Sequence, residues 1–195
     1  MKNVLLFVPC VIFLFLSTLN LNAQTQLQVS IGSDQTICYG SYSNLTAYVA
    51  GGTAPYTFKW SPNEELNAQN TASVIATPTY NTTYKVIVTD AKGNTARDEM
   101  SITVAQRPSI VAETYVNMEV NSKVKLNVRA KGNGTLTYNW RPAAGLDNPT
   151  ASCPVVKPNN STTYTLMVRD ENGCVATEQV MVNVNTAVFA NSKDK

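Results

Sequence analysis

Apolar and polar residues alternate along most of the chain, in short runs that turn-forming residues separate. Alternation with a period of two, in runs rich in Val, Ile, Thr and aromatic residues, predicts strands with one buried face. The runs are Leu45–Ala50, Tyr56–Trp60, Ser73–Pro78, Thr83–Asp90 and Met100–Ala105, then Lys125–Ala130, Leu136–Trp140, Cys153–Pro158, Thr163–Asp170 and Gln179–Val184. No stretch shows a sustained helical period, so we expect an all-β protein.

The runs repeat with a constant shift of 80 positions. Trp60 is matched by Trp140, and further matches follow without a gap at Pro62/Pro142, Leu66/Leu146, Pro78/Pro158, Tyr84/Tyr164, Asp90/Asp170 and Gly93/Gly173. A long internal repeat of this kind indicates two homologous units. We therefore predict one domain at residues 24–106 and a second at 107–185, with a tail at 186–195. The joint at Gln106-Arg107-Pro108 is too short to allow much independent movement.

The spacing of the aromatic residues narrows the fold to an immunoglobulin-like β-sandwich. That fold buries a Trp on strand C and places a Tyr near the start of strand F, whose hydroxyl bonds back to the backbone at the E–F corner. The same spacing of 24 residues separates Trp60 from Tyr84 and Trp140 from Tyr164. We expect all four to be core and tyrosine-corner residues, the alternative being a stacking surface for sugar.

An immunoglobulin domain usually also carries an inter-sheet disulfide, and its strand-F position is apolar here. Val86 and Leu166 stand two residues after the two tyrosines. We expect apolar packing to replace the covalent bond in both domains. The predicted fold is thus two tandem immunoglobulin-like sandwiches.

Several motifs resemble a known family. They are Ile37-Cys38-Tyr39-Gly40, Gly51 to Tyr56, Trp60-Ser61-Pro62 and Thr82 through Gly93, the last repeated in the second domain up to Cys174. Together they look like the PKD-like and immunoglobulin-like repeats of secreted and surface proteins of Bacteroidota, among them adhesins and gliding-associated proteins. The resemblance implies a spacer or binding module, not an enzyme. The WDFGDG-like segment of typical PKD domains is absent, with WSPNEE and WRPAAG in its place.

The first 23 residues have the layout of a secretory signal peptide. A short positive start is followed by the apolar run Val4–Leu16 and by small Ala23. That run is shorter than the 20 or so residues that span a membrane, although a retained anchor is the alternative. We expect a secreted or cell-envelope protein, periplasmic or at the outer surface, without a membrane span in the mature chain. The formal net charge of the whole chain is +2, which gives no indication of a nucleic-acid partner.

Removal of the leader leaves Cys38, Cys153 and Cys174, of which two should pair in an exported protein. The second domain has both Cys153 and Cys174, where the first has Ser73 and Asn94. In an immunoglobulin-like sandwich the D–E and F–G connections share one end, and the A–B turn lies at the other. We therefore predict a Cys153–Cys174 disulfide, with Cys38 left free. The alternative is that Cys174 pairs with an A–B cysteine in domains of the family and lacks that partner here.

The chain offers little catalytic chemistry. It contains no His, which removes the commonest general base and the commonest metal ligand. The adjacent pair Glu64-Glu65 lies in one connection, whereas a glycosidase needs two carboxylates facing each other across a cleft. Asp90 and Asp170 precede Gly in turns, where backbone bonding is favoured over a Ca²⁺ site. We expect no enzyme activity, cofactor or metal.

The pattern favours a structural or adhesive module that presents loops or a sheet edge to a protein partner. The alternative is a carbohydrate-binding module, which needs aromatic rings off the core face. By position the candidate rings are Tyr39, Tyr42, Tyr80 and Tyr115. The sequence does not indicate which ligand is bound.

Overall fold

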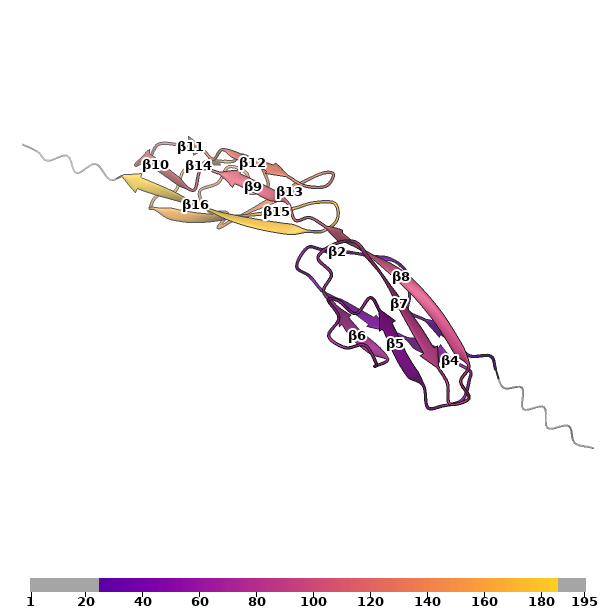
Figure 1. Ribbon diagram of the computed structural model, residues 1–195. Helices are drawn as coiled ribbons and strands as arrows, with labels where there is room; N and C mark the ends of the chain where they lie inside the picture. The colour runs from indigo at the N-terminus through magenta and orange to yellow at the C-terminus, as the bar shows by residue number, and fades with distance from the viewer. Residues whose placement is uncertain (1–24, 186–195) are drawn as a thin grey trace, which may run out of the picture.

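The structure, a computed structural model, describes residues 25–185, and all regular elements in that range are β-strands. It shows two β-sandwiches joined end to end (Figure 1), with β1 to β8 in domain 1 and β9 to β16 in domain 2. The predicted leader at 1–23 and the tail at 186–195 lie outside the described residues. Within that range no helix is long and apolar enough to cross a membrane.

Domain 1 packs a four-stranded sheet against two strand pairs. The four-stranded sheet has the order β2-β8-β7-β5, in which β2 runs parallel to β8. The opposite layer consists of the antiparallel pairs β1-β4 and β3-β6. The strands are β1 (Gln28–Ser30), β2 (Gln35–Cys38), β3 (Ser43–Thr46), β4 (Tyr48–Ala50), β5 (Thr57–Ser61), β6 (Ser73–Ala76), β7 (Thr82–Thr89) and β8 (Thr95–Ala105).

Domain 2 repeats this layout. Its four-stranded sheet has the order β10-β16-β15-β13, and its opposite layer holds the pairs β12-β9 and β11-β14. The strands are β9 (Ser109–Ala112), β10 (Tyr115–Glu119), β11 (Val124–Lys125), β12 (Val128–Lys131), β13 (Thr137–Arg141), β14 (Val155–Val156), β15 (Thr162–Arg169) and β16 (Val175–Asn185). In immunoglobulin lettering, β2 and β10 are strand A′, β5 and β13 strand C, β7 and β15 strand F, and β8 and β16 strand G.

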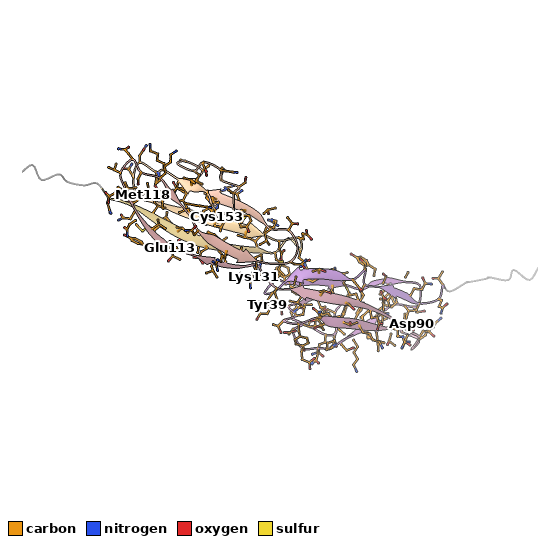
Figure 2. The ribbon with its side chains drawn as sticks, turned by 90° about the horizontal axis from the view of Figure 1, so that it is seen from above. Tyr39, Asp90, Glu113, Met118, Lys131 and Cys153 are labelled. Atoms are coloured by element: carbon orange, nitrogen blue, oxygen red, sulfur yellow. A yellow bond between two sulfur atoms is a disulfide. The ribbon has the colours of Figure 1, made fainter. Side chains whose placement is uncertain are left out.

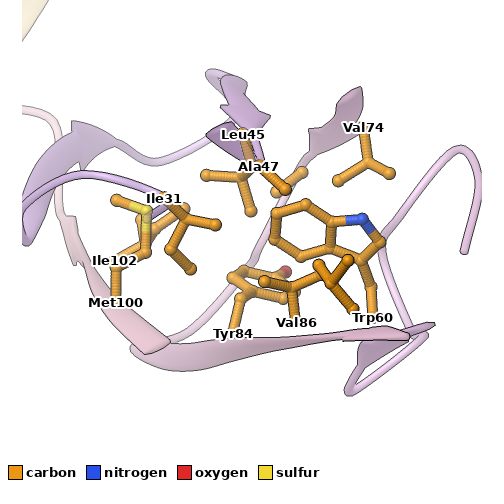
Figure 3. Close-up of a cluster of buried hydrophobic side chains, with 11 residues drawn as sticks. Ile31, Leu45, Ala47, Trp60, Val74, Tyr84, Val86, Met100 and Ile102 are labelled. Carbon is orange, nitrogen blue, oxygen red and sulfur yellow. The ribbon is translucent and has the colours of Figure 1, made fainter. Parts of the chain in front are cut away.

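Alternation along strand F builds each core. Tyr84, Val86 and Val88 point inward from β7 and are fully buried, while the residues between them face outward. Trp60 lies opposite Val86 across the β5–β7 pair and is 2% exposed (Figure 3). Burying one such apolar side chain contributes about 1.5–3 kcal/mol, so these positions account for much of the stability of the domain.

The indole N–H of each core Trp has a partner, as burial of a polar group requires. Trp60 Nε1 donates to the carbonyl of Thr71 at 2.9 Å, and Trp140 Nε1 donates to that of Ala151 at 3.0 Å. Val86 and Leu166 are both fully buried beside the Trp residues, at the position of the usual inter-sheet cysteine. Apolar packing therefore stands where the disulfide would be.

The structure differs from the sequence-based strands in three respects. The last strand of each domain begins earlier than predicted, at Thr95 in place of Met100 and at Val175 in place of Gln179. The run Leu45–Ala50 is divided at Ala47 into β3 and β4, because its halves pair with different partners, β6 and β1. The short A and A′ strands at the start of each domain were not predicted. They have only three to five residues each, too few to show an alternating pattern.

The hydroxyls of the two buried Tyr residues do not bond at the E–F corner, and in this respect the sequence-based expectation was wrong. Tyr164 Oη donates to the carbonyl of Ala144 at 2.9 Å, in the C–D connection 20 residues upstream. Tyr84 Oη is buried and has no hydrogen-bond partner among the described residues. Burial raises the pKa of Tyr84 to about 12, and the neighbouring Glu65 carboxylate adds to the effect.

One substitution between the repeats accounts for the different hydroxyls. The C–D turn places Gly145 at a φ of 82°, and a Cβ built there would lie 2.8 Å from Tyr164 Oη. Domain 1 has Glu65 at the matching position with a φ of 62°, so a Cβ is present at that place. The Glu65 carboxylate accepts from the backbone and hydroxyl of Thr79, at 3.1 and 2.7 Å. Domain 1 thus has a carboxylate bridge where domain 2 has a tyrosine hydrogen bond.

The same Tyr-to-Phe change should have different effects in the two domains. Tyr164→Phe removes the bond to Ala144, and we expect it to lower the free energy of unfolding of domain 2 by about 1 kcal/mol. Tyr84→Phe removes a buried hydroxyl without a protein partner, and we expect it to be neutral or to stabilise domain 1 by up to about 1 kcal/mol. Urea unfolding of both variants checks this. Equal losses in the two domains would contradict it.

Candidate functional site

The distinctive site of this chain is the junction where the two sandwiches meet. β8 ends at Ala105 and β9 begins at Ser109, so only three residues connect the domains. The turn after β2 stays attached to the end of β8, because Tyr39 N donates to Ala105 O at 2.8 Å. The A′–B turn of domain 1 therefore faces the F–G turn of domain 2, and Figure 2 labels Tyr39 and Lys131 at the end where the two domains meet.

A disulfide crosses this junction. Cys38, the last residue of β2, is bonded to Cys174 in the F–G turn of domain 2, with a Cα–Cα distance of 5.5 Å and a sequence separation of 136. The Cys174 side chain is fully buried. A bond between residues so far apart in the sequence joins the two domains covalently, next to the chain connection itself.

The predicted Cys153–Cys174 disulfide is therefore wrong. Cys153 is a free thiol, and its Sγ contacts the carbonyl of Val128 in β12 at 3.5 Å, along the body of domain 2. The prediction treated each domain alone, in which the A–B and F–G turns do lie at opposite ends. In an end-to-end pair, however, the A–B end of one domain meets the F–G end of the next. Cys38 and Cys174 are thus neighbours because they occupy opposite ends of consecutive domains.

Arg107 in the connection bridges the two sides. Its Nε donates to the carbonyl of Tyr39 at 2.9 Å, and its Nη1 donates to the carbonyl of Val175 at 3.2 Å. The planar guanidinium holds its donors in a fixed relation, so the two bonds restrict rotation of one domain against the other. Sequence analysis did not identify this role, and the only signal was the position of Arg107 in the short linker.

The F–G turn that presents Cys174 is built around a buried Asp. The Asp170 carboxylate accepts from Cys174 N at 2.9 Å and from Asn133 N at 3.4 Å. In domain 1 the Asp90 carboxylate accepts from Thr53 N, Lys92 N, Asn94 N and the Asn94 side chain, at 2.8–3.0 Å. Because N–H donors occupy these oxygens, the arrangement is a turn and not a Ca²⁺ site. Among residues 25–185, no three His, Cys, Asp or Glu side chains gather as metal ligands would.

The tyrosines considered for sugar stacking are all exposed, but they do not form one surface. Exposed fractions are 46% for Tyr39, 64% for Tyr42, 63% for Tyr80 and 51% for Tyr115. Tyr39 and Tyr42 lie in the A′–B turn, and Tyr80 lies in the E–F connection, where Asn81 Oδ1 accepts from Val104 N. These three rings therefore share the junction end of domain 1. Tyr115 belongs to β10 in domain 2.

The carboxylates of the C–D connection lie at the same end of domain 1. Glu64 and Glu65 both contribute to the raised pKa of Tyr84, after its burial. The Glu65 side chain is engaged by Thr79, so it supports the E–F connection. The two carboxylates are neighbours in one connection, whereas glycoside hydrolysis needs two carboxylates that face each other across a cleft.

Comparison with known proteins identifies the fold. No protein-family model and no curated protein matches the sequence. Among solved structures, the chain is similar to extracellular domains 3–5 of Drosophila OTK, with a TM-score of 0.50 and 13% identity over 83% of this chain and 62% of that one. It is also similar to the N-terminal eight Ig domains of DSCAM, with a TM-score of 0.60 and 16% identity over 82% of this chain and 24% of that one.

Both domains have the immunoglobulin-like fold. At identities this low the likeness shows the fold alone, and the chain spans less than two thirds of either structure it matches. The tandem arrangement agrees with the two sandwiches of Figure 1.

The cysteine pairing can be tested directly. Non-reducing peptide mapping should find Cys38 linked to Cys174, and Cys153 should react with a thiol reagent in the unfolded, unreduced chain. Cys153→Ser should leave the map otherwise unchanged. A Cys153–Cys174 peptide would contradict the structure.

Opening the disulfide should loosen the junction without unfolding the domains. We expect Cys38→Ser to broaden the distribution of interdomain distances, measured by small-angle scattering or spin-label pairs, and Arg107→Ala to broaden it further. The chain-entropy estimate for a loop of this length is about 5 kcal/mol when the loop unfolds as one unit. We expect a smaller loss of stability, because each domain has its own core. Unchanged distances in the double variant would contradict the role assigned to the junction.

The Asp90 turn should make stability depend on pH. Hydrogen bonds, first that from the Asn94 side chain and then those from the backbone, hold the Asp90 pKa below its ordinary value. A carboxyl with a lowered folded pKa stabilises the fold above its ordinary pKa, and this contribution disappears as pH falls through the folded value. Asp90→Asn should therefore destabilise domain 1 at pH 7 and less so below pH of about 3. Urea unfolding against pH, with exposed Glu113→Gln as control, tests this; a loss independent of pH would contradict it.

Proposed function

We propose that this chain is an exported, non-catalytic module that holds two immunoglobulin-like domains in a fixed orientation and binds a protein partner at the cell surface or in the envelope. The interdomain disulfide carries the proposal. Structural disulfides are typical of oxidising compartments, which fits export behind a leader at residues 1–23. The functional domains in this proposal are residues 24–106 and 107–185, of the PKD-like type found in Bacteroidota adhesins.

A fixed orientation matters for a protein that presents surfaces to a partner. If the domains moved freely, a partner that contacts both would have to order them on binding, at a cost in affinity. The disulfide and the two bonds of Arg107 provide that order in advance. The sheet faces and edges remain available, because the junction occupies only the ends of the domains.

Carbohydrate binding is the second candidate, supported by the three exposed rings Tyr39, Tyr42 and Tyr80 at one end of domain 1. Flat aromatic rings stack on sugars, and Glu64 in the neighbouring connection could accept hydroxyl hydrogen bonds. Against it, the fourth candidate ring, Tyr115, lies apart on β10 of domain 2, so the four rings do not form one surface. We therefore rank a protein partner first.

The experiment that separates the two is a pull-down from the envelope of the source organism, run beside a glycan array with the same chain. We expect the chain to capture a specific protein. The double variant Cys38→Ser with Arg107→Ala should bind that protein about tenfold more weakly, because the partner would then have to order the domains. Cys153→Ser is the matched control and should not change capture. A glycan signal lost in Tyr80→Ala, without a protein partner, would establish the second candidate instead. The proposal would be overturned if the double variant captured the protein as well as the unmodified chain does, or if no protein were captured.

A further inference from the structure

The turn that domain 1 contributes to the junction has a counterpart at the far end of domain 2. Before Gly51 the repeat has a shift of 81 residues, which places Glu119 at the position of Cys38 and Val120 at that of Tyr39. The backbone bonds match: Tyr39 N to Ala105 O corresponds to Val120 N to Asn185 O, and Ser41 N to Cys38 O corresponds to Ser122 N to Glu119 O. Gly40 and Asn121 both have positive φ, at 76° and 65°. The far end of domain 2 therefore presents the same A′–B turn.

The surface that receives this turn also has a counterpart, at the outer end of domain 1. A hollow of about 370 Å³ lies there, lined by Thr25, Gln26, Leu27, Gly52, Asn94 and Thr95. In the repeat register, these six residues correspond to Gln106, Arg107, Pro108, Gly132, Cys174 and Val175. Of these counterparts, residues 106–108 form the connection between the domains. Cys174 is bonded to Cys38, and the carbonyl of Val175 accepts a hydrogen bond from Arg107. The open hollow is thus the equivalent of the occupied junction surface.

The F–G turns on the two surfaces have the same geometry. Asp90 N donates to Asn94 O at 2.9 Å and Asp170 N donates to Cys174 O at 3.1 Å. The return bonds, from Asn94 N to Asp90 Oδ1 and from Cys174 N to Asp170 Oδ1, measure 2.8 and 2.9 Å. The backbone of Asn94 is therefore held in the same way as the backbone of Cys174, whose sulfur bonds Cys38.

The residues that stand at the positions of the two bonded cysteines are chemically complementary. Asn94 Nδ2 donates one hydrogen to Asp90 Oδ2 at 3.0 Å and has a second to give. Glu119, at the position of Cys38, carries a carboxylate that accepts such a bond. Gln26, at the position of Arg107, has a carboxamide that can donate to a carbonyl such as that of Val120. A polar contact between these groups would be the reversible equivalent of the covalent bond.

We propose that the outer end of domain 1 binds the A′–B turn at the far end of domain 2 of a second copy of this chain, head to tail. The two surfaces lie at opposite ends of the molecule, as Asp90 and Met118 show in Figure 2, so one chain cannot satisfy itself. Repeated contacts between two different surfaces build an open series, or a ring where the rotation per chain closes. In either product the junction geometry recurs between chains.

Paired cysteines test the contact, in the chain from Gln24 onward, which keeps every described residue, and in a Cys153→Ser background. Asn94→Cys and Glu119→Cys are made in separate chains and mixed under mild oxidation. We expect the mixture to form a disulfide-linked dimer about tenfold faster than either variant alone, since docking raises the effective concentration of the two thiols. Asn94→Cys mixed with Asn139→Cys, an exposed position on β13, is the matched control. Peptide mapping verifies that Cys38–Cys174 stays intact.

A second measurement uses the unmodified chain. Its weight-average mass in sedimentation should rise with concentration, and Glu119→Lys should abolish the rise. Equal cross-linking rates in matched and control mixtures, or a mass that stays monomeric up to about 1 mM, a weak limit for association, would overturn the proposal. Both measurements contain no partner protein, so their outcome is independent of whether the proposed function holds.

Discussion

The orientation of the two domains depends on two covalent tethers that leave domain 1 from adjacent strands. Cys38 on β2 is the registered partner of Ala105 on β8, so the disulfide and the peptide connection start about 5 Å apart, the spacing of neighbouring strands. Two tethers this close prevent separation but still permit rotation about the line that joins them. Arg107 opposes that rotation, because it binds carbonyls on both sides, at Tyr39 and Val175. The junction needs all three elements to hold one geometry.

The same F–G turn serves two purposes in the two repeats. Its backbone is fixed by the Asp carboxylate in both, through Asp90 in domain 1 and Asp170 in domain 2. The residue four positions after the Asp can therefore differ between the repeats. It is Asn94 in domain 1 and Cys174 in domain 2. In domain 1 the Asn side chain adds a bond to the Asp carboxylate, which the Cys cannot make. The backbone of the turn is thus the same in both domains, and the side chain at this position determines what the end of the domain contacts.

Sequence patterns predicted the parts of the fold that depend on periodicity and on large apolar residues. The spacing of Trp60 from Tyr84, repeated in domain 2, indicated the sandwich core, and all four aromatic residues are buried. The A and A′ strands escaped notice because three to five residues carry too little alternation. Whether each Tyr hydroxyl has a hydrogen-bond partner depends on one Cβ, which is present in Glu65 and missing in Gly145. The alternation of apolar and polar residues contains no information about this atom. The cysteine pairing depends on the arrangement of whole domains, so reasoning within one domain led to Cys153.

The junction confines all interdomain contact to the ends, and the two sheet faces that it leaves open are chemically different. On domain 1, the outward ladder of β5, β7 and β8 carries Lys59, Lys85, Arg97 and Glu99. On domain 2, the equivalent face of β13, β15 and β16 has Asn139, Thr165, Thr177 and Gln179 at the matching positions, and its charges are Arg141 and Arg169. Two faces that differ at these central positions are thereby held at a set distance and angle. A binding partner with matching surfaces can recognise that relation, whereas neither sandwich alone displays it.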